Sequence, residues 1–83
     1  MYADTLDELR ELMAEQPETS PSVFLRDDGF AAHCYDDMTV RELRSAFERD
    51  ADPEECRRWG LSATEWKEHI AMALTAKIAS GPT

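Results

Sequence analysis

The stretch from Asp52 to Ala79 constrains the fold most, because it carries start and stop signals for two consecutive helices. Asp52 suits a helix N-cap, and Pro53 suits the first helical position, where the N–H that it lacks would be unpaired anyway. Gly60 stands where that helix would close with a residue in the left-handed conformation. The sequence therefore predicts a short helix that ends in a tight turn.

A second helix is predicted to begin directly after that turn. Ser62 and Glu65 have capping-box spacing, in which the serine hydroxyl accepts from the N–H of Glu65 and the carboxylate accepts from the N–H of Ser62. Leu61 and Trp66 flank the cap at the positions of a hydrophobic staple. Apolar side chains then recur at helical spacing, so we expect a long helix over residues 63–79.

The N-terminal residues predict an amphipathic helix, capped by Asp4 or Thr5 and extending to about Gln16. At roughly 100° per residue, its apolar side chains fall on one face and its carboxylates on the other. The carboxylates form a stripe of Asp4, Glu8, Glu11 and Glu15, with Asp7 at its edge. Such a stripe is typical of a solvated helix face, and the alternative is a docking surface for a basic partner.

A β-hairpin is predicted after the first helix. Two prolines and three hydroxyl residues make residues 17–22 a linker. Two apolar runs, Val23 to Arg26 and Phe30 to Tyr35, then flank Asp27-Asp28-Gly29. Asp-Gly between apolar runs favours a two-residue hairpin turn, in which both central residues have positive φ. Residues 30–33 also tolerate a helix, but the turn signature favours the hairpin.

Thr39 and Glu42 form another capping box, which predicts a helix from Val40 to about Arg49. The predicted class is therefore α+β but mostly helical. We expect residues 1–83 to form one small domain ordered helix–β-hairpin–helix–helix–helix, with residues 80–83 as a C-terminal tail. The predicted core comprises Leu6, Leu9, Met13, Val40, Leu43, Phe47, Trp59, Leu61, Trp66, Ile70, Leu74 and Ile78.

The net charge of −9 is the compositional outlier, and most of it lies in the first part of the chain. Residues 1–37 hold ten acids and two bases, whereas residues 38–83 hold eight acids and seven bases. This charge opposes nonspecific binding to nucleic acid or to anionic membranes. A partner with a basic surface would meet the N-terminal part first.

Cysteine content and hydropathy favour a cytoplasmic protein without membrane contact. Two cysteines are too few for a disulfide-stapled secreted scaffold. The chain begins with no basic, apolar signal segment, and its longest apolar run, residues 70–74, is too short to span a bilayer.

Side chains that support catalysis or metal binding are sparse. His33, Cys34, Cys56 and His69 are the soft metal ligands, and none has the spacing of a zinc site. Cys34 with His69 is the one pair that could make an activated nucleophile, and nothing in the sequence brings them together. We therefore expect no metal, no cofactor and no enzymatic activity.

The helical pair at residues 53–70 also matches the outline of a DNA-binding helix–turn–helix. Cys56, Gly60 and Leu61 have the spacing of its turn. In that interpretation the recognition helix would begin at Ser62, Ala63, Thr64 and Lys67, with Arg57 and Arg58 touching phosphate. Glu65, Glu68 and the net charge oppose it, because they repel phosphates.

The leading hypothesis is a non-enzymatic protein-binding module that inserts its acidic surface into a basic, nucleic-acid-binding groove of a partner, in the manner of phage-type anti-restriction and anti-CRISPR inhibitors. The alternative is a helix–turn–helix-like DNA-binding regulator. A homodimer through Ala71, Met72, Ala76 and Ala79, or a purely structural component, is also considered. The predicted partner-binding residues are Asp4, Asp7, Glu8, Glu11, Glu15, Asp27, Asp28, Asp36 and Asp37.

Overall fold

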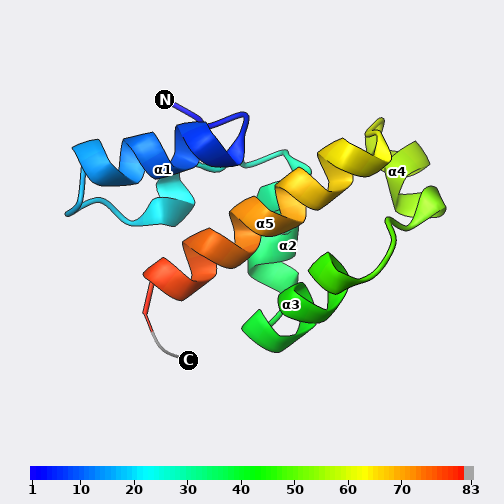
Figure 1. The fold of residues 1–83 in the computed structure, drawn as a ribbon. Coiled ribbons are helices and arrows are strands. Elements are labelled where there is room, and N and C mark those ends of the chain that lie inside the picture. The colour runs from blue at the N-terminus through cyan, green and yellow to red at the C-terminus, as the bar shows by residue number, and fades with distance from the viewer. Residues whose placement is uncertain (82–83) are drawn as a thin grey trace.

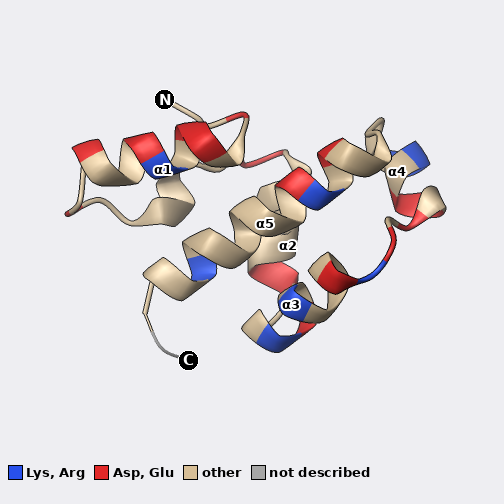
Figure 2. Ribbon diagram, viewed as in Figure 1, with Lys and Arg blue, Asp and Glu red and all other residues tan. Residues whose placement is uncertain are grey.

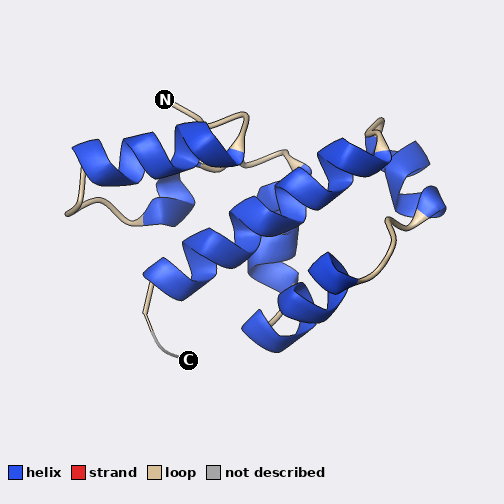
Figure 3. Ribbon diagram, in the orientation of Figure 1, coloured by secondary structure: helices blue, strands red, loops and turns tan. Residues whose placement is uncertain are grey.

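The long C-terminal helix of the computed structural model lies at the centre, and the other helices pack around it (Figure 1). The elements are α1 (Leu6–Glu15), the 3-10 helix η1 (Pro21–Phe24), α2 (Phe30–Asp37), α3 (Val40–Glu48), α4 (Pro53–Trp59) and α5 (Ala63–Ala79). The structure describes residues 1–81, and every regular element in that range is a helix (Figure 3). Helices α1 and η1 pack on α5 in one apolar cluster, α3 packs on it in a second, and α2 contributes to both.

The helix boundaries follow the local signals in the sequence. Gly60 has φ 67°, the left-handed conformation predicted for the turn between α4 and α5. Both predicted capping boxes form, at Thr39 with Glu42 and at Ser62 with Glu65. Hydrogen bonds from the backbone N–H and then the side chain of Ser62 lower the pKa of Glu65. The first helix is capped by the Thr5 hydroxyl, which accepts from the N–H of Glu8 at 3.2 Å.

The predicted β-hairpin, and with it the α+β class, is wrong: residues 30–37 form helix α2. A two-residue hairpin turn needs positive φ at its central residues, but Gly29 has φ −96° and caps α2 instead. The N–H of Gly29 donates to the carbonyl of Arg26 at 3.0 Å, so residues 26–29 form an ordinary reverse turn. Phe30, Ala31 and Cys34 are buried, and their spacing is that of one helix face.

The predicted linker over residues 17–22 is irregular to Ser20, after which Pro21 begins η1. This short helix brings Phe24 and Leu25 into the core, and the N–H of Ala3 donates to the carbonyl of Phe24 at 2.8 Å. Of the predicted tail, Ser80 is the C-cap of α5, and residues 82–83 lie outside the described range.

Two apolar clusters lie along α5. One joins α1, η1 and α5 with Ala31 of α2, and Met72 and Ala76 are its α5 members. The other joins α2, α3 and α5, and Trp66, Ile70 and Ala73 are its α5 members. Because α5 contributes to both clusters, its buried arc is much wider than a single amphipathic stripe.

The predicted core is therefore correct in part. Leu9, Leu43, Trp66 and Ile70 are buried. Phe47 and Ile78 are 45% and 50% exposed, so these two core assignments are wrong. The buried residues absent from the prediction are Ala3, Leu12, Phe24, Leu25, Phe30, Ala31, Cys34, Ala46, Met72, Ala73 and Ala76.

Charged side chains of α5 bind the free ends of the helices around it. The Glu68 carboxylate accepts from the N–H of Leu6 at 2.7 Å, at the start of α1. Lys67 Nζ donates to the carbonyl of Phe47 in the last turn of α3. Lys77 Nζ donates to the carbonyls of Tyr35 and Met38 at 2.8 and 2.6 Å, at the end of α2. Each charge has the sign that the dipole of the bound helix end favours.

Replacing Lys77 by methionine tests this arrangement. The methionine keeps the apolar stem but leaves two part-buried carbonyls without their donor. We expect K77M to lower the free energy of unfolding by about 1–3 kcal/mol, measured by urea denaturation. The matched control is R58M, which removes an exposed cation of α4 and should change stability by less than about 0.5 kcal/mol. Equal losses in the two variants would contradict the capping role.

Candidate partner-binding surface

The acidic stripe predicted for the first helix is present on α1. Asp7, Glu8, Glu11 and Glu15 are exposed on the side of α1 away from the buried Leu9, and the buried Leu12 borders the stripe. In Figure 2 the acidic segments recur along the outer side of α1. Within residues 1–81 no lysine, arginine or histidine nitrogen comes within 4.0 Å of these four carboxylates. Their charge is therefore uncompensated by any local ion pair.

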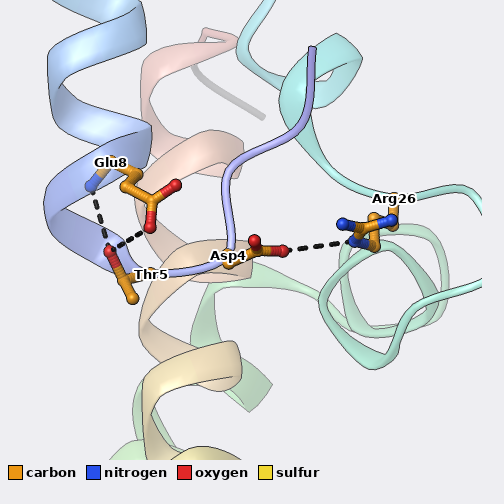
Figure 4. Close-up of polar contacts among 4 residues, drawn as sticks. All are labelled: Asp4, Thr5, Glu8 and Arg26. Atoms are coloured by element: carbon orange, nitrogen blue, oxygen red, sulfur yellow. Dashed lines mark hydrogen bonds and ion pairs between the residues drawn. The ribbon is translucent and has the colours of Figure 1, made fainter.

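Asp4 differs from the four acids of this stripe because it forms an ion pair. Its carboxylate accepts from Arg26 Nε at 3.2 Å, and both side chains are more than half exposed (Figure 4). The Arg26 guanidinium also lies over the Tyr2 ring, 5.6 Å from its centroid. The pair joins the start of α1 to the turn before α2, so Asp27 and Asp28 lie in the turn that Arg26 anchors. Sequence reasoning missed Arg26, because no local pattern marks a contact between residues 22 positions apart.

The remaining predicted residues belong to α2 and its preceding turn. Asp27 and Asp36 line one hollow of about 290 Å³, together with Ser22, Leu25, Ala32 and Tyr35. Asp37 is one turn from His33, and its Oδ2 lies 3.3 Å from His33 Nδ1. The structure thus brings Asp27 and Asp36 together and places Asp37 in a separate contact with histidine.

The nine predicted residues therefore form three groups rather than one surface. The first group is the stripe on α1, the second is the Asp4–Arg26 pair with the adjoining turn, and the third is the end of α2, where Asp36 shares a hollow with Asp27 of the second group. Figure 2 shows the first group on one side of α5 and the end of α2 close to α3, on the other side. Of the three, only the stripe on α1 combines several exposed carboxylates with the absence of an ion pair, and Arg10 is the one cation on the same helix.

The helical pair α4–α5 has the predicted turn, but its charged groups are partly engaged. Lys67 binds the carbonyl of Phe47 and lies over the Phe47 ring, 5.4 Å from its centroid. Glu65 and Glu68 bind helix starts, and their negative charges remain beside Lys67. Arg57 and Arg58 are exposed on α4.

The face considered for a homodimer is largely covered by the chain itself. Met72 and Ala76 are buried against α1 and η1. Ala71 is half-buried and Ala79 is exposed, so only these two of the four remain at the surface.

The two thiols differ in environment. Cys34 is 1% exposed in the cluster between α2, α3 and α5, and burial raises its pKa from 9.0 to about 12, with smaller contributions from Glu55 and Asp37. At neutral pH it is therefore a thiol, whereas nucleophilic catalysis needs the thiolate. Cys56 is half-buried. His69 Nδ1 lies 2.7 Å from the carbonyl of Glu65.

Within residues 1–81, no group of three or more His, Cys, Asp or Glu side chains is arranged to hold a metal ion. None of the helices in that range combines the length and the apolar content that crossing a bilayer requires. Comparisons with protein-family models, with curated proteins and with solved structures found no match for the chain. The candidate function therefore depends on the geometry and charge of the chain itself.

The buried thiol makes stability sensitive to alkaline pH. Because the pKa of Cys34 is higher in the folded state than in the unfolded state, its contribution is complete below pH 9.0 and is lost between pH 9.0 and about 12. One pH unit inside this window corresponds to about 1.4 kcal/mol. We expect the stability of the wild type to fall faster than that of C34A between pH 9 and 10.5, measured by urea denaturation. Parallel pH profiles would contradict the buried-thiol account.

Proposed function

We propose that this chain is a non-enzymatic protein-binding module whose acidic α1 face occupies a basic, nucleic-acid-binding groove of a partner protein. The observation that carries the proposal is the row of exposed, unpaired carboxylates Asp7, Glu8, Glu11 and Glu15. An inhibitor that competes with nucleic acid for its binding protein, in the manner of phage-type anti-restriction or anti-CRISPR proteins, would use such a row.

The charge spacing supports mimicry of a nucleic-acid strand. A helix rises about 1.5 Å per residue, so the four carboxylates from Asp7 to Glu15 span about 12 Å of axis. That is roughly one charge per 4 Å, close to the value of about 3.4 Å for the phosphates of one DNA strand. The individual intervals along the axis are about 1.5, 4.5 and 6 Å, so the resemblance lies in the mean charge density of the row and not in each spacing.

Rigidity of α1 also supports the proposal. Its opposite face is anchored by the buried Leu9 and Leu12, and its first turn is held by Thr5 and Glu68. The backbone positions that carry the carboxylates are thus fixed before contact, which lowers the entropic cost of binding. Complementary charge increases the association rate, and this advantage weakens as salt screens the charges.

The test replaces Glu8, Glu11 and Glu15 by glutamine in a chain used to capture its partner from host lysate, before and after nuclease treatment. Each exposed pair contributes at most about 1 kcal/mol, so we expect the triple variant to bind about 10- to 100-fold more weakly at low salt. Its affinity should also depend less on salt, and the partner's own nucleic acid should compete with the wild type.

The matched control is the triple variant E18Q/E48Q/E54Q, which removes the same charge at exposed positions outside the α1 stripe. It should keep wild-type affinity, which separates the effect of this face from that of net charge. Equal weakening in the two triple variants, or unchanged affinity in the α1 variant, would reject the proposal.

The alternative function is a DNA-binding regulator that uses α4 and the start of α5. The specific feature in its favour is the left-handed Gly60 turn, followed by the exposed Ser62 and Thr64. A gel-shift series at low salt separates the two functions, because the regulator binds duplex DNA directly and the mimic does not. A shift that R57Q/R58Q abolishes would favour the regulator.

A further inference from the structure

Helix α4 differs from the other helices in how it is packed. Within residues 1–81 it is the one helix with no buried residue. It contacts the rest of the chain through the half-buried side chains of Cys56 and Trp59, which pack on the apolar cluster of α2, α3 and α5. Figure 1 shows α4 at the edge of the molecule, beside the start of α5. It is therefore a cover on that cluster and not part of its interior.

Trp59 joins α4 to α2. The centroid of its ring lies 5.5 Å from that of Phe30 and 5.4 Å from that of His33. Phe30 and Cys34 are only 2% and 1% exposed. The negative charge of Glu55 on α4 contributes to the raised pKa of Cys34, so α4 lies close to this thiol. Burial of Phe30 and Cys34 therefore depends in part on α4.

Polar contacts do not hold α4 in place. Within residues 1–81 no hydrogen bond or ion pair joins α4 to α1, α2 or α3. Its polar contacts are local: the Asp52 carboxylate accepts from the N–H of Glu54 at 2.9 Å, and the Cys56 thiol lies 3.9 Å from the carbonyl of Ser62. Helices α1, α2 and α3, in contrast, are each bound at one end by a charged side chain of α5. Separation of α4 therefore breaks apolar and aromatic contacts but no hydrogen bond to these three helices.

The connections on both sides of α4 allow it to move as a unit. Residues 49–52 before it are irregular, and Gly60 after it has φ 67°, in the left-handed region that glycine adopts freely. The capping box of Ser62 and Glu65 fixes the start of α5 independently of α4. Regions with few buried apolar contacts open locally at a lower free energy than global unfolding. A helix with no buried residue and no polar contact to α2 or α3 meets that condition.

We propose that α4 is a flap that opens about residues 49–52 and Gly60 while the other helices stay folded. Opening separates the Trp59 ring from α2 and exposes Phe30 and the Cys34 thiol to solvent. It also takes apart the α4–α5 pair on which the DNA-binding alternative depends. Helix α1 belongs to the other apolar cluster, so the flap is independent of the function proposed for the acidic stripe.

The test measures how often the Cys34 thiol becomes accessible in C56A, in which Cys34 is the single cysteine. N-ethylmaleimide reacts with a thiol that is 1% exposed only when the structure around it opens. The rate of modification, divided by the rate for a short unstructured peptide with the sequence around Cys34, gives the open fraction. We expect this fraction without urea to exceed the unfolded fraction from urea denaturation at least about tenfold, which corresponds to about 1.4 kcal/mol. It should change little at low urea concentrations, since opening exposes little surface.

Replacing Trp59 by alanine in the same C56A background removes the ring that holds α4 on α2. We expect C56A/W59A to raise the rate of Cys34 modification without urea by at least about tenfold. C56A/W59F keeps an aromatic ring at this position and should raise the rate less. The matched control is C56A/L12V, which trims a buried side chain of the other cluster. It should lower the free energy of unfolding but leave the modification rate without urea unchanged.

Circular dichroism and urea denaturation verify that each variant is folded. An open fraction equal to the global unfolded fraction in C56A would overturn the proposal. Equal acceleration in the L12V and W59A variants would also overturn it, because Cys34 would then be reached through unfolding of the whole chain. Where W59A fails to fold, the C56A and W59F measurements decide by themselves.

Discussion

The arrangement of this chain depends on three charged side chains of α5 that bind the ends of three other helices. Glu68 binds the start of α1, Lys67 the end of α3 and Lys77 the end of α2. The hydrophobic effect is non-directional, whereas a charged hydrogen bond to a free helix end is directional and specifies which group that end meets. These contacts therefore set how far along α5 each helix lies, and thereby which side chains reach the surface.

Because α5 is central, the surface of α1 and the surface of α3 carry different kinds of charged side chains. On one side, α1 turns its buried leucines inward and its carboxylates outward. On the other side, α3 and the second half of α5 present apolar groups beside arginines. A protein of net charge −9 thus has an acidic face on α1, whereas α3 carries acids and arginines side by side.

The candidate site could be predicted from sequence only where its geometry is local. The α1 stripe depends on one helical period, which residues four positions apart already show. The contact of Asp4 with Arg26 joins two elements, and the shared hollow of Asp27 and Asp36 requires α2 to be a helix. Neither contact could be predicted, because the segment that carries Arg26, Asp27 and Asp36 contains an Asp-Gly dipeptide that favoured a hairpin. Gly29 instead caps α2, because burial of the face containing Phe30 and Cys34 outweighs the preference of an isolated turn.

By itself, the sequence determined the starts and ends of helices, including the two capping boxes, the Pro53 start and the left-handed turn at Gly60. These features depend on backbone groups within one turn, so a few adjacent residues specify them. Only the tertiary structure decided which apolar side chains are buried. A helical stripe shows which residues share a face, but coverage of that face depends on elements distant in the chain. Met72 and Ala76 are buried in the cluster with α1 and η1, whereas Phe47 and Ile78 stay exposed because neither apolar cluster of the described residues includes them.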